Sequence, residues 1–340
     1  MGPWNAVSGV FATARTRREI ARRLAELDVA PHRTLRDEIE EWAAEHGRRP
    51  ALVSADGAER MTHDDLAGRA ARWTRWTILH GAARGEPVAL LMANRPERVA
   101  AWLGVAASGA VADVVDPALA GETLAAAITD AAPRLLVVDA GLLPRFETAA
   151  PHLSVMTAVW VHGPHAMAYP RLDEALADLS AERLRPADRR SLAATDTALR
   201  TRTASGASER VDHRTAIRAM HAAAAACGAT RADRLDLSGL GLTDPAAVLA
   251  VGIATTTGGL AVTGGGDAAT PRATPATLLA FDGDGADRRD EAAARPRAGI
   301  AVGLGPDEAR READRLGLPR RLSWRAGEIA TATGDLLWRA

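Results

Sequence analysis

The sequence predicts an α/β fold in which helices cover both faces of a mainly parallel sheet. The first observation is a series of short apolar runs typical of buried strands, at residues 87–92 (PVALLM), 109–116 (GAVADVVD), 135–139 (LLVVD) and 158–162 (AVWVH). The second is that helical patterns alternate with these runs, at residues 97–108 and 121–130. Parallel strands need such crossovers, and they are apolar along their length because both faces of the sheet are buried. With 47% hydrophobic and 25% charged residues, the 340-residue chain has the composition of a globular protein with a large core.

Further elements are predicted on both sides of this alternating region. Thr34 and Asp37 form a potential capping box for a helix over residues 34–46, and Gly81 follows a helix over residues 62–80. The other predicted elements are strands at 51–54 and 260–263, a strand with a glycine turn at 299–305, and helices at 216–227, 247–257 and 306–316. We divide the chain into a helical lead-in (1–30), a first α/β subdomain (31–165), a linker (166–195) and a second, shortened α/β subdomain (196–340).

The composition excludes several kinds of chemistry. All 42 basic residues are arginine, so no mechanism can use a lysine ε-amine as a Schiff base or as a phosphate ligand. The net charge of −1 gives no basic field for nucleic acid, and no apolar run is long enough to span a bilayer. The single cysteine, Cys227, lies in an alanine-rich run and is predicted to be buried rather than nucleophilic. We expect a cytoplasmic protein, either free or peripheral to a membrane.

Five segments stand in an order that is known from one family of enzymes. They are 85–97 (GEPVALLMANRPE), 102–109 (WLGVAASG), 109–124 (GAVADVVDPALAGETL), 233–237 and 306–319 (PDEARREADRLGLP). Together they resemble adenylate-forming acyl-CoA synthetases, most closely the branch of fatty acid transport proteins and very-long-chain acyl-CoA synthetases. The resemblance implies that the chain forms the N-terminal lobe of such an enzyme and that the family's C-terminal lobe is missing. Family members activate a carboxylate with ATP to an acyl-adenylate, and then pass the acyl group to a thiol, usually that of CoA.

The resemblance places a phosphate-binding loop at residues 203–213 (TASGASERVDH). Its candidate ATP-binding residues are Thr203, Ser205, Gly206 and Ser208. The family pattern Thr-Ser-Gly-Thr-Thr-Gly-x-Pro-Lys is shortened here and has lost its lysine. Glu209 stands where the polyphosphate would lie, which is repulsive unless Arg210 compensates. The alternating charges of residues 200–203 (RTRT) predict that the strand before this loop lies at an exposed sheet edge.

The resemblance also implies an adenine and ribose site near the end of the sequence. Trp324 takes the first aromatic position of the adenine motif, and Arg325 takes the position of the ring that stacks on adenine. Glu328 falls one residue short of the glutamate that holds Mg²⁺, so a one-residue slip would make it the catalytic carboxylate. A guanidinium plane can stack on a base, but a polar surface turn is the alternative for this segment. Asp335 matches the family's ribose-binding aspartate, unless its Thr-Gly-Asp tripeptide is a coincidence.

Three hypotheses for the function remain open. The first is an AMP-forming carboxylate–CoA ligase that uses ATP, Mg²⁺ and CoA, with its activity impaired or completed by a partner protein that supplies the missing lobe. The second is a non-catalytic pseudoenzyme that binds a fatty acid, an acyl-CoA or a partner protein. The third is a decayed product without a stable fold, against which the helix caps and periodicity of the first half argue. We expect no nucleic-acid partner, no dedicated metal site and no transmembrane span.

Overall fold

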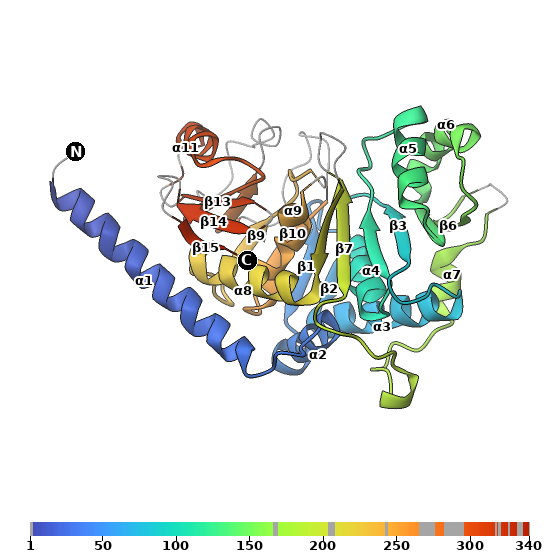
Figure 1. The fold of residues 1–340 in the computed structure, drawn as a ribbon, viewed down its shortest axis with the longest axis horizontal. Coiled ribbons are helices and arrows are strands. Elements are labelled where there is room, and N and C mark those ends of the chain that lie inside the picture. The colour runs from blue at the N-terminus through green and yellow to red at the C-terminus, as the bar shows by residue number, and fades with distance from the viewer. Residues whose placement is uncertain are drawn as a thin grey trace.

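The computed structural model confirms the α/β fold class, with two sheets and helices around and between them (Figure 1). It describes residues 3–165, 169–202, 208–241, 244–264, 276–281, 296–316, 318, 321–325, 327–331 and 336–339. The main hydrophobic core joins both sheets to α3 (His63–Leu79), α4 (Pro96–Ala107) and α8 (His213–Cys227). Cys227 lies in this core with 0% exposure, which confirms that it is buried.

The smaller sheet has six strands in the order β6-β5-β3-β4-β7-β8, and all of them are parallel except β8. Its strands are β3 (Pro87–Leu91), β4 (Val111–Val114), β5 (Leu135–Asp139), β6 (Ala158–His162), β7 (Thr197–Arg202) and β8 (Ser208–Asp212). The helices α5 (Gly121–Ala131) and α6 (Leu143–Ala149) cover its outer face over a second apolar cluster, and α7 (Leu172–Ala177) follows β6. The predicted alternation of strands and helices is therefore confirmed.

The larger sheet has nine strands in the order β15-β14-β13-β12-β11-β9-β10-β1-β2. These are β1 (Pro50–Ser54), β2 (Arg60–Thr62), β9 (Arg234–Asp236), β10 (Leu260–Thr263), β11 (Leu278–Phe281), β12 (Ala298–Val302), β13 (Arg321–Arg325), β14 (Glu328–Thr331) and β15 (Leu336–Arg339). The six strands from β13 to β1 in this order are parallel, and β2, β14 and β15 pair antiparallel at the two ends. The helices of this half are α9 (Pro245–Leu249), α10 (Val251–Thr255) and α11 (Pro306–Arg315).

The two sheets exchange strands along the chain. The early strands β1 and β2 lie in the nine-stranded sheet, whereas β7 and β8 complete the six-stranded sheet that the first half begins. Each sheet therefore takes strands from both sides of the segment 166–195. The division of the chain into subdomains at that segment stays a prediction.

Local sequence signals explain where the helices begin. Asp37 accepts a hydrogen bond from the backbone N–H of Thr34 (2.8 Å), which caps α2 (Leu35–His46) as predicted. The N-terminal helix α1 (Pro3–Asp28) extends away from the body of the molecule, and its later part packs on α8 (Figure 1). The helices α3 and α4 pack closely because Gly104 has no side chain: a Cβ there would lie 2.4 Å from the Cβ of Trp73.

The prediction that the charged strand before the loop lies at an exposed edge is wrong for its described residues, 200–202. The strand β7 lies between β4 and β8, and Arg200 is 5% exposed. Its Nε and Nη2 each donate to a carboxylate oxygen of Asp113 at 2.7 Å. Asp113 lies opposite Arg200 in the register of β4 and β7 and is 1% exposed. A charged strand is stable inside the sheet because the guanidinium and the carboxylate neutralise one another in a bidentate pair.

Candidate functional site

The described part of the predicted phosphate loop forms the strand β8, which pairs antiparallel with β7, and then the first residue of α8. Arg202 at the end of β7 pairs with Ser208 at the start of β8, so five residues connect the two strands. Ser208 is exposed. The candidate ligands Thr203, Ser205 and Gly206 lie outside the described residues. Because Arg202 and Ser208 are paired across β7 and β8, the connection between these strands can have no more than five residues.

The predicted adenine motif lies at the end of β13. Trp324 is 1% exposed and its ring belongs to the main core, whereas the side chain of Arg325 is exposed. Glu328 begins β14 opposite Arg325, and its carboxylate accepts a hydrogen bond from Arg339 on β15 at 2.9 Å. Asp335 lies outside the described residues. The roles of these four residues in binding a ligand stay predictions.

Asp244 lies near both the β7–β8 hairpin and the end of β13, and the sequence did not predict a role for it. It caps α9, where its Oδ1 accepts a hydrogen bond from the backbone N–H of Ala246 at 2.7 Å. Burial raises the pKa of Asp244; the charge of Glu209 raises it further, and the charge of Arg325 opposes the shift. The phosphate-loop hairpin and the adenine motif therefore lie within electrostatic reach of one carboxyl group. The signal in the sequence is an Asp directly before Pro245, a typical start of a helix.

The turn after β12 lies on the same side of the molecule. Gly303 has a φ of 74°, and a Cβ on it would lie 3.4 Å from Oδ2 of Asp244. Glycine suits this left-handed position and lets the turn come close to the carboxylate. We call Glu209, Asp244, Gly303, Arg325 and Glu328 the hairpin site.

The described residues of the hairpin site carry charges of both signs. ATP brings several negative charges, and such sites supply backbone amides and cations to meet them. Here Glu209 and Asp244 contribute two carboxyl groups beside the predicted phosphate loop, and Arg325 is the cation whose charge acts on Asp244. The chain has no lysine to add a second kind of cation.

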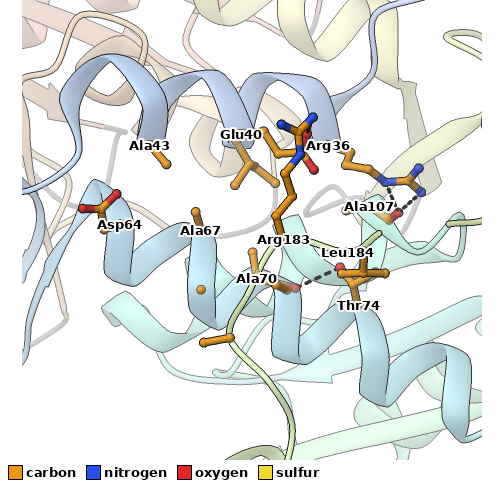
Figure 2. Close-up of a pocket in the computed structure, with 14 residues that line it drawn as sticks. Arg36, Glu40, Ala43, Asp64, Ala67, Ala70, Thr74, Ala107, Arg183 and Leu184 are labelled. Carbon is orange, nitrogen blue, oxygen red and sulfur yellow. Dashed lines mark hydrogen bonds and ion pairs between the residues drawn. The ribbon is translucent and has the colours of Figure 1, made fainter. Parts of the chain in front are cut away.

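A separate pocket of about 240 Å³ lies between α2, α3 and the segment 181–184 (Figure 2). Its walls are mostly small apolar residues, among them Ala43, Ala67 and Ala70. Arg183 reaches from the segment 181–184 towards Glu40 on α2, as Figure 2 shows. No residue of the hairpin site and no predicted ligand of ATP lines this pocket. It is therefore distinct from the region that the resemblance indicates.

Comparison with known proteins decides the family. A family model described as AMP-binding enzyme matches residues 39–224, more than half of the chain. The chain belongs to the AMP-binding enzyme family. A 3-hydroxybenzoate–CoA ligase from Aromatoleum sp. is 37% identical over 114 residues, which are 34% of this chain and 21% of the ligase. The human long-chain fatty acid transport protein 6 is 31% identical over 128 residues, 37% of this chain and 20% of that protein.

The structural comparison agrees with this assignment. The N-terminal domain of FACL13 from Mycobacterium tuberculosis has a TM-score of 0.71 at 18% identity, over 88% of this chain and 79% of that one. The fold is thus that of the N-terminal lobe of an adenylate-forming enzyme, and the predicted resemblance is confirmed. The matched region spans about a fifth of each of the two curated relatives. Among the helices that the structure describes, none is long and apolar enough to cross a membrane.

Proposed function

We propose that this AMP-binding, acyl-CoA synthetase-like protein binds a fatty or aromatic carboxylic acid, and that its ATP-dependent activation of that acid is strongly impaired. In the family, ATP and Mg²⁺ supply the adenylation chemistry and CoA accepts the acyl group. The alternative is a non-catalytic pseudoenzyme whose partner is an acyl ligand or another protein. Both versions keep the acid-binding lobe and differ in whether any adenylation remains.

The observation that carries the proposal is the five-residue hairpin between Arg202 and Ser208, with Glu209 directly after it. A family loop with its second glycine and lysine holds the phosphates through backbone amides and a cation. Here two carboxyl groups, Glu209 and Asp244, stand beside the shortened loop. Removing a single preorganised contact to a transition-state charge costs about 100- to 1000-fold in rate. Several such losses together support a very slow adenylation step.

ATP–pyrophosphate exchange tests the proposal directly. We expect exchange with benzoates and long-chain fatty acids to be below a thousandth of that of an intact 3-hydroxybenzoate–CoA ligase assayed in parallel. Exchange within tenfold of that enzyme would contradict the impairment. If weak exchange is present, the variant Glu328→Gln tests whether Glu328 contributes to it. Loss of the exchange in this variant would show that the carboxylate of Glu328 takes part. An unchanged rate would exclude Glu328 from the reaction.

A gain of nucleotide binding gives a second, independent test. In the double variant Glu209→Gln/Asp244→Asn, both carboxylates become neutral amides, and Asn is still a good helix cap for α9. We expect Mg-ATP to raise the melting temperature of this variant but not that of the unchanged protein, because the repulsion of the polyphosphate is removed. The double variant Glu174→Gln/Asp178→Asn loses the same charge at α7, on the opposite side of the molecule from α9 and β13 (Figure 1), and serves as the control. An equal ATP response in all three proteins would contradict the electrostatic explanation.

A further inference from the structure

One buried arginine of this protein lacks the partners that such a group normally has. Arg98, in the first turn of α4, is 3% exposed, and its Nη2 donates to Oδ1 of Asn94 at 2.8 Å. Among the residues that the structure describes, none accepts a hydrogen bond from Nε or Nη1. No carboxylate of the described chain lies within ion-pair distance of it. Burial lowers the pKa of Arg98 to about 10, and the charge of Asp139 only partly offsets this.

Buried guanidinium groups are rare without an anion, because they lose their hydration and gain nothing in return. The neighbouring Arg95 illustrates the normal arrangement: its Nε and Nη2 donate to the two carboxylate oxygens of Asp139 at 3.1 and 2.7 Å. The charge of Asp139 is thus already neutralised by Arg95, so Asp139 cannot neutralise Arg98 to the same extent. The unused donors of Arg98 point to an anion that the described part of the chain does not supply.

The position of Arg98 is where α/β folds bind ligands. In the six-stranded sheet, β4 and β5 lie on opposite sides of β3, so the chain reverses its direction of winding at β3. Ligands of such sheets bind outside the carboxyl ends of the strands at this switch point. Arg98 belongs to the helix that begins directly after the carboxyl end of β3.

The carboxyl ends of β9 and β10, in the nine-stranded sheet, lie close to the start of α4. Nδ2 of Asn94 donates to the carbonyl of Leu237, just after β9, at 3.0 Å. Gly264, just after β10, comes so close that a Cβ on it would lie 3.5 Å from the carbonyl oxygen of Asn94. Asn94, which holds Arg98, is therefore the point where the carboxyl edges of the two sheets are joined.

Two threonine hydroxyls at these strand ends are also buried without a partner. Thr263 is the last residue of β10 and is 1% exposed; Thr201, near the end of β7, is 0% exposed. Within the described part of the chain, neither hydroxyl makes a hydrogen bond. A hydroxyl can donate to an anion as a guanidinium can. Arg98, Thr201 and Thr263 therefore share one property: each has a buried donor group without a partner among the described residues, at or next to a strand end of the two sheets.

We propose that Arg98, assisted by the hydroxyls of Thr201 and Thr263, binds the oxyanion of a ligand at the junction of the two sheets. The shared chemistry is an oxygen anion, which the carboxylate of an acid or a phosphate group can supply. The inference depends on the proposed function only for the choice of acids to be tested. It does not require adenylation, so an inactive protein can still have this site.

Binding of simple anions to the whole protein tests this inference. Melting temperatures are measured with benzoate, octanoate and pyrophosphate, each against sodium chloride at equal ionic strength. We expect at least one oxyanion to raise the melting temperature of the unchanged protein in a saturable way. A response to the two acids alone assigns the site to a carboxylate, and a response to pyrophosphate alone assigns it to a phosphate. If no oxyanion exceeds chloride, the inference is wrong.

Variants locate the binding. Without ligand, Arg98→Leu should melt at a higher temperature than the unchanged protein, because it removes an uncompensated buried charge. Its affinity for the oxyanion should fall at least tenfold. Thr263→Val keeps the shape and removes one hydroxyl, and we expect it to weaken the affinity about threefold. Arg183→Leu removes a charge at an exposed position and should bind like the unchanged protein.

The variants also separate this inference from the proposed function. Unchanged affinity in both Arg98→Leu and Thr263→Val would overturn the oxyanion site, whatever the exchange assay shows. Full anion binding that depends on Arg98, together with rapid ATP–pyrophosphate exchange, would keep the site and overturn the impairment. If Arg98→Leu does not fold, Thr263→Val alone decides, because an affinity equal to that of the unchanged protein then counts against the site.

Discussion

Arg200 and Arg98 are both buried in the first α/β layer, but their surroundings differ. The guanidinium of Arg200 forms two hydrogen bonds of 2.7 Å with Asp113 on the neighbouring strand. Within the described residues, the guanidinium of Arg98 has one hydrogen bond, to the neutral amide of Asn94, four residues earlier in the chain. The hydrogen bonds of Arg200 are thus made within the fold and stabilise it. Arg98 instead lowers the stability of the folded protein unless a ligand accepts hydrogen bonds from its free donors. Burial alone therefore does not distinguish a structural arginine from a binding arginine, but the count of satisfied donors does.

The largest expected effect comes from removing the partner of Arg200. In Asp113→Ala, the guanidinium of Arg200 would be buried without an anion, as Arg98 is now. We expect the free energy of unfolding to fall by about 3–5 kcal/mol, because the fold then carries an uncompensated buried charge. Urea denaturation followed by circular dichroism measures this change.

The paired replacement sharpens the interpretation. Asp113→Val/Arg200→Met replaces both charges by apolar groups, and we expect it to recover most of the lost stability. If Asp113→Ala alone costs less than about 1 kcal/mol, water or a shifted side chain satisfies Arg200 and the comparison with Arg98 fails. If the double variant is as unstable as the single one, packing rather than charge explains the loss.

Two buried histidines extend the comparison to groups that the fold keeps neutral. His213 is 0% exposed, and burial lowers its pKa from 6.5 to about 4; the charge of Arg36 lowers it further, against Asp196. His63, 1% exposed, is lowered to about 4 in the same way. Between pH 6.5 and 4, these two histidines become protonated in the unfolded chain but stay neutral in the folded protein. Stability therefore falls as the pH falls through this range.

The size of this effect follows from the shifts. At pH 5, each of the two histidines should cost about 2 kcal/mol relative to pH 7.5, since each pKa unit is worth about 1.4 kcal/mol. Urea denaturation of the unchanged protein at the two pH values gives the total. His63→Phe should lose about 2 kcal/mol less than the unchanged protein over the same range. An equal loss in both proteins would mean that His63 becomes protonated in the folded state.

The strands β3 to β6 and the helices between them could be predicted from the sequence because their signals are local. The capping box of Thr34 and Asp37 and the apolar run of β3 each lie within a few residues. The burial of Arg200 could not be predicted, because its partner Asp113 lies 87 residues earlier and meets it only through the pairing of β4 with β7. The segment 200–203 therefore looked like an exposed edge.

The candidate site was predicted only in part for the same reason. The resemblance located the hairpin loop and the end of β13, since both are contiguous motifs. Asp244 was missed because its importance depends on the charge of Glu209, which lies 35 residues away in the sequence. Arg98 was missed because an arginine after Pro96 and Glu97 resembles the exposed start of a helix. Which donors remain unsatisfied depends on the whole fold and cannot be read from a segment.

The smallest expected effect concerns an arginine at the surface. The side chain of Arg183 is 67% exposed and forms an ion pair with Glu40 across the pocket of Figure 2. Arg183→Ala should change the free energy of unfolding by no more than about 0.5 kcal/mol, because water replaces the exposed partner. Arg189 pairs with the same carboxylate at 2.8 Å, but it is 17% exposed and also donates to the carbonyl of Leu184 at 2.7 Å. Arg189→Ala should therefore cost more, about 1–2 kcal/mol, since it leaves a half-buried acceptor unsatisfied. Urea denaturation of both variants checks the order, and an equal cost would mean that burial does not set the contribution of these arginines.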